Sequence, residues 1–221
     1  MLNTDEQGQR QQSLSVAILA GGMSRRMGTD KALLSLRPGD PPFLAATRDR
    51  VRAISDDVFV IATNRPQYAQ FGMPLVQDAV PEGGALGGIL TALRHARHDH
   101  CLVIPCDLPF LNLRLLTWMA SQPRDYDVLI PYLPGESRQG HGYIYQTLHA
   151  IYGRACLPAI EEHLTTGRKQ VIGFFDEVYV RRIDESTVRS FDPDLRSFFN
   201  ANTPEALASA RAIAAEIGGD R

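Results

Sequence analysis

Short runs of consecutive apolar residues alternate along this chain with segments in which apolar residues recur at helical spacing. The runs at residues 16–20, 58–63 (VFVIAT) and 101–106 (CLVIPC) are almost entirely apolar, which is typical of strands buried on both faces. Residues 43–54 and 86–93 instead place their apolar side chains on one helical face. This alternation predicts an α/β fold, a three-layer α/β/α, Rossmann-like arrangement with a mostly parallel sheet.

The second half of the chain repeats the pattern less regularly. We expect strands at residues 74–78, 127–133, 143–145, 171–175 and 178–183, helices at 111–120 and 148–164, and a polar loop at 134–142. Gly167 is expected to end the helix at 148–164. The last helix is the most clearly marked, because Thr203 can cap it and Pro204 occupies its first position.

Composition narrows the class of protein. Of the 221 residues, 44% are hydrophobic and 22% are charged, as in soluble globular domains. The formal net charge of −2 argues against a dedicated nucleic-acid binder, and no apolar run is long enough to span a membrane. The polar residues 1–13 predict a disordered tail, and 14–221 a single domain. Cys101, Cys106 and Cys156 form no CxxC pair, which is typical of the reducing cytoplasm.

The segment after the first predicted strand combines a turning backbone with positive charge. It reads GGMSRRMGTDK, from Gly21 and Gly22 through Arg26 to Lys31. Glycines let the backbone turn and present its N–H groups to an anion, so we expect this loop to hold a phosphate chain beside Arg26 and Lys31. Its spacing matches neither GxxxxGK[ST] nor GxGxxG. The alternative is an ordinary turn with solvated basic residues.

Polar residues also follow the other predicted strands. Asn64 and Asp107 each come directly after an apolar run, and Asp78 precedes a glycine-rich segment that leads into a helix. Ligands of parallel sheets bind at the carboxyl ends of the strands. A buried carboxylate there requires a cation, and beside a phosphate chain Mg²⁺ on Asp107 fits best. The alternative role for Asp107 is to cap the helix that begins near Leu111.

Five motifs resemble those of the molybdenum cofactor guanylyltransferase family, within the nucleotidyltransferases of the nucleotide-diphospho-sugar transferase type. They are LAGGMSRRMGTDKALL (19–34), TNR (63–65), QDAVPEGGALGG (77–88), PCDLP (105–109) and NANTPEAL (200–207), so the resemblance covers essentially the whole chain. Two positions depart from the family pattern. Family members commonly carry GPL in place of residues 84–86, and a histidine-proline pair in place of His141 and Gly142.

The resemblance implies an enzyme that transfers GMP from GTP to the terminal phosphate of molybdopterin and releases pyrophosphate, with Mg²⁺ as cofactor. It implies cofactor insertion or delivery proteins as partners. The resemblance also implies residue roles. On the nucleotide side, contacts are implied for Leu19, Ala20, Gly21 and Gly22, phosphate contacts for Lys31, and base and ribose contacts for Asn64 and Asp78. Asp107 would bind both nucleotide and Mg²⁺, and the substrate contacts would come from His141, Asn200 and Asn202, the last near the metal or the pterin.

Phosphoryl-type transfer depends on positioning and charge neutralisation and needs no covalent catalyst. Arg26, Lys31 and a metal on Asp107 would supply that neutralisation. Cys106 is expected to point away from Asp107 and to be a buried core thiol. The histidines at 95, 98 and 100 match no standard zinc spacing. Arg181 and Arg182 are expected to form a solvated strand face, and the alternative is that one of them contacts a phosphate.

Two other functions stay open at this point. One is a nucleotidyltransferase of the same fold that uses CTP or acts on a sugar phosphate, although sugar-1-phosphate enzymes usually extend the loop before the lysine. The other is a non-catalytic protein that holds the molybdenum cofactor for delivery. A pure carrier needs no metal-binding carboxylate, so Asp107 argues for the enzyme.

Overall fold

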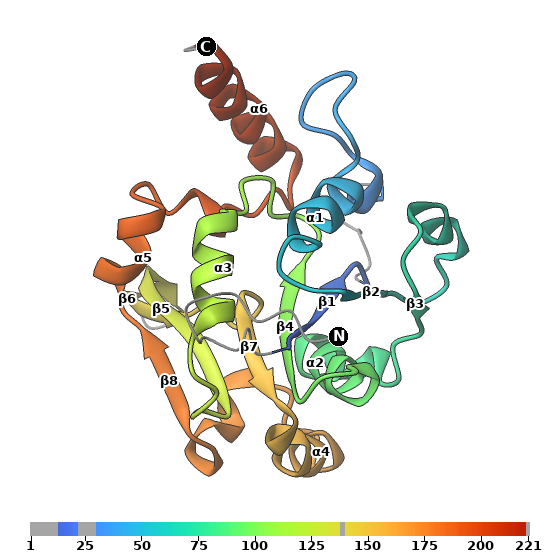
Figure 1. Cartoon of the computed structure of the whole chain (residues 1–221), viewed down its shortest axis with the longest axis vertical. Coiled ribbons are helices and arrows are strands. Elements are labelled where there is room, and N and C mark those ends of the chain that lie inside the picture. Colours follow the sequence, from blue (N-terminus) through green and yellow to red (C-terminus); the bar gives the residue numbers. More distant parts are fainter. Residues whose placement is uncertain (1–12, 22–29, 138–139, 220–221) are drawn as a thin grey trace, which may run out of the picture.

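The computed structural model describes residues 13–21, 30–137 and 140–219. An eight-stranded sheet forms its centre, in the order β3-β2-β1-β4-β7-β5-β6, with β8 also paired to β5 (Figure 1). The strands are β1 (Ser15–Leu19), β2 (Asp57–Ile61), β3 (Leu75–Val76), β4 (His100–Pro105), β5 (Val128–Ser137), β6 (Gly140–Tyr145), β7 (Ala150–Gly153) and β8 (Val180–Ile183). The helices are α1 (Phe43–Val51), α2 (Gly84–His95), α3 (Leu113–Ser121), α4 (Leu157–Thr165), α5 (Glu185–Phe191) and α6 (Pro204–Gly219).

Most of the sheet is parallel, as predicted. β1 pairs in parallel with β2 and β4, β2 with β3, and β5 with β8. β7 runs antiparallel between β4 and β5, and β6 runs antiparallel to β5. β5 therefore points in the same direction as β4, and the carboxyl ends of β1, β2, β4, β5 and β8 lie at the same edge of the sheet.

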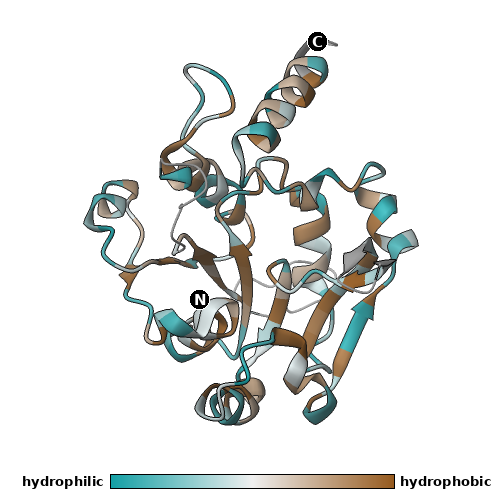
Figure 2. Cartoon of the chain, turned by 180° about the vertical axis from the view of Figure 1, so that it is seen from behind, coloured by the Kyte–Doolittle hydropathy of each residue, from teal (hydrophilic) through white to brown (hydrophobic). Residues whose placement is uncertain are grey.

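Each central strand sends alternate side chains into two separate cores. Val16 and Ile18 of β1 pack with α1, α3 and α5, whereas Ala17 between them packs with α2 and α4. This alternation explains why the strands are apolar at every position, since both faces are covered. Figure 2 shows the central strands as a hydrophobic layer. The predicted three-layer α/β/α arrangement is confirmed.

The register of the parallel strands determines where the loops of the carboxyl edge begin. Leu19 of β1 pairs with Ile61 of β2 and with Pro105 of β4. The Ala20 N–H donates to the Ile61 carbonyl (2.9 Å), and the Cys106 N–H donates to the Leu19 carbonyl (3.1 Å). The segments that follow these three strands therefore leave the sheet side by side.

The prediction of one helix over residues 148–164 is wrong in its first part. Residues 150–153 form β7, and helix α4 begins only at Leu157. All four residues of β7 are buried, between β4 and β5, so pairing with these strands overrides the helical pattern. Pro158, in the first turn of α4, marks the true start. Gly167 ends the helical segment as expected, since its φ is 75° and its N–H donates to the Leu164 carbonyl (3.1 Å).

Two other expectations in the second half are also wrong. The predicted polar loop at 134–142 is largely hairpin, because β5 continues to Ser137 and β6 begins at Gly140. A hairpin arm is held by backbone hydrogen bonds, which the polar side chains there do not oppose. The predicted strand at 171–175 is a 3-10 helix over Val171–Glu177. Its buried residues are Val171, Phe174 and Phe175, while Ile172 is half exposed, which is helical spacing rather than alternation.

The carboxyl-terminal helix follows the prediction closely. The Thr203 hydroxyl accepts a hydrogen bond from the Ala206 N–H (3.1 Å), and Pro204 begins α6. Phe43, Ala201 and Leu207 form a small core at its base, and the helix then projects from the body of the molecule (Figure 1). In the ranges described, no helix is both long and apolar enough to cross a bilayer. The division into a tail (1–13) and one domain (14–221) stays a prediction, and the tail falls almost wholly outside the described residues.

Gly87→Ala should destabilise the protein. A Cβ at Gly87 would lie 2.3 Å from the Val80 carbonyl oxygen, a backbone atom that cannot rotate away. Overpacking of this kind costs about 1–3 kcal/mol, which exceeds the roughly 1 kcal/mol that alanine gains in a helix. Urea unfolding measures the difference. Gly142→Ala is the control, since a Cβ there meets no atom of the described residues within 4 Å. Equal stability of the two variants would contradict the prediction.

Candidate active site

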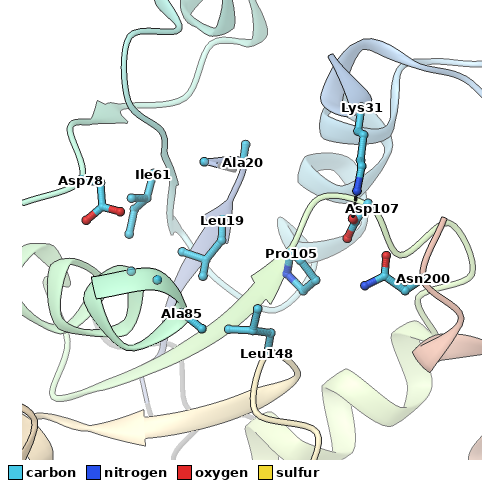
Figure 3. A pocket seen from close by; sticks show the side chains of 13 residues that line it. Leu19, Ala20, Lys31, Ile61, Asp78, Ala85, Pro105, Asp107, Leu148 and Asn200 are labelled. Carbon is cyan, nitrogen blue, oxygen red and sulfur yellow. Dashed lines mark hydrogen bonds and ion pairs between the residues drawn. The ribbon is translucent and has the colours of Figure 1, made fainter. Parts of the chain in front are cut away.

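A hollow of about 320 Å³ lies at the carboxyl ends of β1, β2 and β4. Leu19, Ile61 and Pro105, the last residues of the three strands, all reach it (Figure 3). The remaining lining residues are Ala20, Gly21, Lys31, Asp78, Gly84, Ala85, Gly88, Asp107, Leu148 and Asn200. Residues that lie more than a hundred positions apart in the sequence thus share one cavity.

Lys31 and Asp107 form an ion pair on one side of this hollow. The Lys31 Nζ lies 3.5 Å from the Asp107 Oδ2, and their side chains are 21% and 14% exposed (Figure 3). Lys31 begins a 3-10 helix capped by Asp30, whereas Asp107 follows directly after β4. The long distance and the remaining exposure leave both groups able to contact a ligand.

Asp107 has an unusual environment for a carboxylate. Burial raises its pKa above the ordinary range, although the nearby Lys31 ammonium acts in the opposite direction. Its Oδ1 is buried and has no hydrogen-bond partner among the described residues. Asp107 does not cap α3, because Asn112 does so by accepting from the Leu115 N–H (3.1 Å). The capping alternative is therefore wrong, and Oδ1 is left available to a further cation, since Lys31 pairs with Oδ2.

Asp78 and the first turn of α2 lie across the hollow from Asp107 (Figure 3). The Asp78 Oδ1 accepts from the Val80 N–H (3.0 Å) and lies 3.0 Å from the Thr91 hydroxyl, which fixes the side chain. Gly84, with a φ of 59°, begins α2, and no side chain of the described residues caps this helix. Its free N–H groups and partial positive charge therefore border the cavity.

The glycine-rich segment after Asp78 leads into a helix, as the sequence predicts. Gly84 to Leu86 form the first turn of α2. Gly87 allows the helix to approach the Val80 carbonyl, and a Cβ on Gly88 would lie 3.1 Å from Leu19. These glycines thus hold α2 close to the end of β1.

The carboxyl-terminal motif reaches the site through the backbone. The Ala201 N–H donates to the Asp107 carbonyl (3.0 Å), which brings Asn200 into the lining of the hollow. Asn202 is half-buried and is not one of the lining residues. Of the two asparagines expected here, the structure therefore brings one to the cavity.

The other predicted residues are placed less directly. Asn64 is exposed just beyond β2, with a φ of 53°, and is not among the described residues that line the hollow. Asparagine tolerates this left-handed conformation better than most residues, so it supports the sharp turn after β2. Gly22 and Arg26 lie outside the described residues. His141 lies in β6, paired with Glu136, and only its backbone is described.

Sequence reasoning missed the residues that hold Lys31 in place. The Asp30 Oδ1 accepts a hydrogen bond from the buried Tyr68 hydroxyl (2.6 Å), and its Oδ2 lies 3.6 Å from the Arg65 Nε. Burial and the Asp30 carboxylate raise the pKa of Tyr68, so its hydroxyl stays a donor. The only sequence signal was Asp30 beside Lys31, since its partners lie more than thirty residues away.

Residues considered for other chemistry have ordinary structural roles. Cys106 is buried on the side of α1 and α3, and burial raises the pKa of its thiol, so the expected core position is confirmed. The histidines face separate partners: His95 packs on Phe59, and His98 faces Asp56. His100 lies 3.2 Å from the Tyr126 carbonyl, and burial lowers its pKa.

The donor set at Asp107 fits magnesium rather than a fully protein-ligated metal. Across the described residues, no three His, Cys, Asp or Glu side chains come together to hold a metal ion. Mg²⁺ is commonly bound through one or two carboxylates, with substrate phosphates and water as the other ligands. One carboxylate with an unpartnered oxygen, beside a lysine and a helix N-terminus, meets that requirement.

Comparison with known proteins gives concordant results. The model of the MobA-like NTP transferase domain matches residues 16–180. A probable molybdenum cofactor guanylyltransferase from Pelotomaculum thermopropionicum is 36% identical, over 89% of this chain and 91% of the relative. A molybdenum cofactor guanylyltransferase from Desulfosudis oleivorans is 34% identical, over 88% and 93%.

Solved structures share the fold. Molybdopterin-guanine dinucleotide biosynthesis protein A from Archaeoglobus fulgidus superposes with a TM-score of 0.75 at 24% identity, covering 91% of this chain and 99% of the other. A 4-diphosphocytidyl-2C-methyl-D-erythritol synthase from Anaerococcus prevotii gives 0.65 at 15% identity, covering 92% and 96%. The predicted nucleotide-diphospho-sugar transferase type of fold is thereby confirmed. With a family model over most of its length and relatives above 30% identity, the chain belongs to the MobA-like NTP transferase family.

Proposed function

We propose that this protein transfers GMP from GTP to the terminal phosphate of molybdopterin, forming the guanine dinucleotide cofactor and pyrophosphate. The observation that carries the proposal is the Lys31–Asp107 pair, where a buried carboxylate with an unpartnered oxygen faces a cation at the ends of β1 and β4. Relatives named molybdenum cofactor guanylyltransferases support the choice of reaction.

The chain's own groups suit attack of one phosphate on another. Lys31 and the N-terminus of α2 lie on opposite sides of the hollow, so both can neutralise charge on a triphosphate. The described part of the site contains no activated nucleophile, because Cys106 is buried with a raised pKa. Binding therefore has to align the acceptor phosphate with the α-phosphorus, and the leaving pyrophosphate stays near Lys31.

We propose Mg²⁺ as the metal, held by Asp107 and by phosphate oxygens. When bound, it would neutralise charge that develops on the α-phosphate and on the leaving group. Asp107 has to be ionised to hold it, and the ion would in turn favour the ionised form.

We assign the nucleoside to the side of the hollow lined by Asp78 and the start of α2. The Asp78 Oδ1 is fixed by Val80 and Thr91, so the carboxylate is preorganised to accept hydrogen bonds from a base or ribose. Asn64 and Arg26 belong to this proposal as contacts of the nucleotide, and Asn200, Asn202 and His141 as contacts of the acceptor. The buried thiols of Cys101, Cys106 and Cys156 are all free, which suits the cytoplasmic location that we propose together with delivery proteins as partners.

The direct test is an assay with purified protein, GTP, Mg²⁺ and molybdopterin. We expect the guanine dinucleotide and equimolar pyrophosphate, and no product when the metal is chelated. Efficient product formation with CTP but not with GTP would contradict the guanine assignment. Binding of the cofactor without any pyrophosphate release would instead indicate a carrier.

Asp107→Asn should strongly reduce the rate of transfer without weakening the fold. Loss of one preorganised charge of this kind costs roughly 10²–10³ in kcat. Because the pKa of Asp107 is raised in the folded state, its ionised form at neutral pH lowers stability. The variant should therefore unfold at the same or a higher urea concentration than the wild type. Pyrophosphate release and urea unfolding measure the two effects.

The control for this variant is Asp99→Asn at the other end of β4, where the side chain is 88% exposed. It should change neither measurement appreciably.

The raised pKa of Asp107 also predicts that wild-type kcat/KM falls on acidification with a midpoint above that of an ordinary aspartate. Full activity of Asp107→Asn would refute the role of this carboxylate.

Tyr68→Phe should reduce catalysis through the position of Lys31. The change removes the hydroxyl that donates to Asp30 but keeps the ring, so Asp30 and the adjacent lysine lose their anchor. We expect kcat/KM for GTP to fall about tenfold and stability to fall by about 1–2 kcal/mol.

Tyr126→Phe is the matched control, because Tyr126 is similarly buried and its hydroxyl lies 2.7 Å from the Arg124 Nη1, away from the site. It should lose comparable stability and keep wild-type kinetics. If both variants keep wild-type kcat/KM, Tyr68 has a purely structural role.

A further inference from the structure

Arg182 of β8 lies over two neighbouring tyrosine rings and is not paired with a carboxylate of the described residues. Its guanidinium carbon lies 5.0 Å from the centre of the Tyr132 ring and 5.2 Å from that of Tyr145. No hydrogen bond or ion pair joins Arg182 to any other residue that the structure describes. Its neighbour Arg181 differs, since it faces the other side of the strand and pairs with Asp125 (3.2 Å). Arg182 is therefore an exposed cation with a fixed position and unused donors.

A shallow hollow of about 620 Å³ surrounds this arginine. Tyr143 borders it with half of its side chain exposed, and its hydroxyl donates to the Glu185 Oε2 (2.7 Å). The Glu185 Oε1 in turn accepts from the Arg189 Nε (2.7 Å). A carboxylate has about four acceptor positions, so Glu185 can still accept hydrogen bonds from a ligand. The hollow thus combines flat aromatic faces, an unpaired cation and an acceptor.

The hollow lies at the same edge of the sheet as the Lys31–Asp107 pair. Leu102 of β4 and Leu129 of β5 both pair with Ile151, so Pro105 and Tyr132, each three residues further on, are level. Arg182 of β8 pairs with Ile130 of β5, two residues before Tyr132. Figure 1 shows β5, β6 and β8 together at one side of this edge, and Figure 2 shows the hydrophilic stretch of β8.

Both hollows also open over the same face of the sheet. Side chains at every second position of a strand point to the same face of the sheet. Val128 and Ile130 pack toward α2 and α4, so Tyr132 lies on that face as well. Gly84 and Ala85 of α2 line the first hollow. Tyr145 and Leu148 both pack against the core on this face. Tyr145 lies under Arg182, and Leu148, three residues later, lines the first hollow. This short segment therefore connects the two hollows.

The distance between the two hollows suits a single extended ligand that occupies both. Neighbouring strands lie about 4.8 Å apart, so the three spacings from β4 through β7 and β5 to β8 amount to about 14 Å. A ligand whose phosphate is at Asp107 would therefore place its far end near Arg182. That end should be flat and aromatic, with N–H donors for Glu185 and electron-rich atoms for the guanidinium.

We propose that the hollow formed by Tyr132, Tyr143, Arg182 and Glu185 binds the pterin ring system of the acceptor while its phosphate lies at Asp107. This inference rests on the proposed function, which supplies the identity of the acceptor. The ring stacks on the tyrosine and guanidinium planes, and its amino-pyrimidine edge donates to Glu185. Nucleotide binding does not involve this hollow.

Arg182→Met tests the proposal, with Arg181→Met on the same strand as the matched control. The first variant keeps an apolar side chain over the tyrosines but removes the charged plane. We expect its KM for molybdopterin to rise about tenfold, while its KM for GTP stays at the wild-type value. Arg181→Met should leave both constants unchanged. Tyr143→Ala, at an exposed side chain, gives a second measurement if Arg182→Met unfolds at a lower temperature.

Binding of pterin-6-carboxylate can be measured through the fluorescence of the pterin and requires no transfer of GMP. It therefore tests the pterin site independently of the proposed function. We expect saturable quenching that Arg182→Met weakens and that saturating GTP does not displace. A wild type that shows this binding but transfers no GMP would remove the proposed function and retain the pterin site. Unchanged KM for molybdopterin in both Arg182→Met and Tyr143→Ala, or displacement of the pterin by GTP, would overturn the proposal.

Discussion

The parallel pairing of β1 with β2 and β4 determines the geometry of the candidate site. Because Leu19, Ile61 and Pro105 are level, the segments after them begin at one height and converge on one hollow. The ladder is buried on both faces, so a shift of one residue would exchange the two cores and is strongly disfavoured. The position of Asp107 is therefore as well determined as the core itself.

The ionised carboxylate of Asp107 lowers the stability of the folded protein. Asp107 is largely buried, its pKa is raised, and one of its oxygens has no partner among the described residues. A group chosen for stability would be neutral or fully bonded. The arrangement is understandable if a ligand provides the partner of Oδ1, because binding then recovers part of the free energy that burial of the carboxylate costs. Lys31 supplies part of the compensation, because burial raises the pKa of the carboxyl whereas the Lys31 ammonium, 3.5 Å from Oδ2, acts to lower it.

The sequence predicted the parts that depend on local pattern. Continuous apolar runs identified β1, β2 and β4, and the residues directly after them led to Asp107 and Lys31. The errors lie where long-range pairing decides the conformation. Residues 150–153 have a composition that suits a helix or a strand, and only their place between β4 and β5 selects the strand. Tyr68 and Arg182 carried no local signal, because their roles depend on Asp30 and on Tyr132, which are distant in sequence.

The hydrogen bond from Ala201 to Asp107 has a consequence for biosynthesis of the protein. The strands β1, β2 and β4 and both members of the Lys31–Asp107 pair are translated first, whereas the wall that carries Asn200 is translated only after β5 to β8. A chain still on the ribosome can thus form the nucleotide-facing strands early while one side of the hollow stays open to water. The hollow therefore acquires all of its walls only after residue 201 has been translated, so a product interrupted before that point lacks the wall contributed by Asn200.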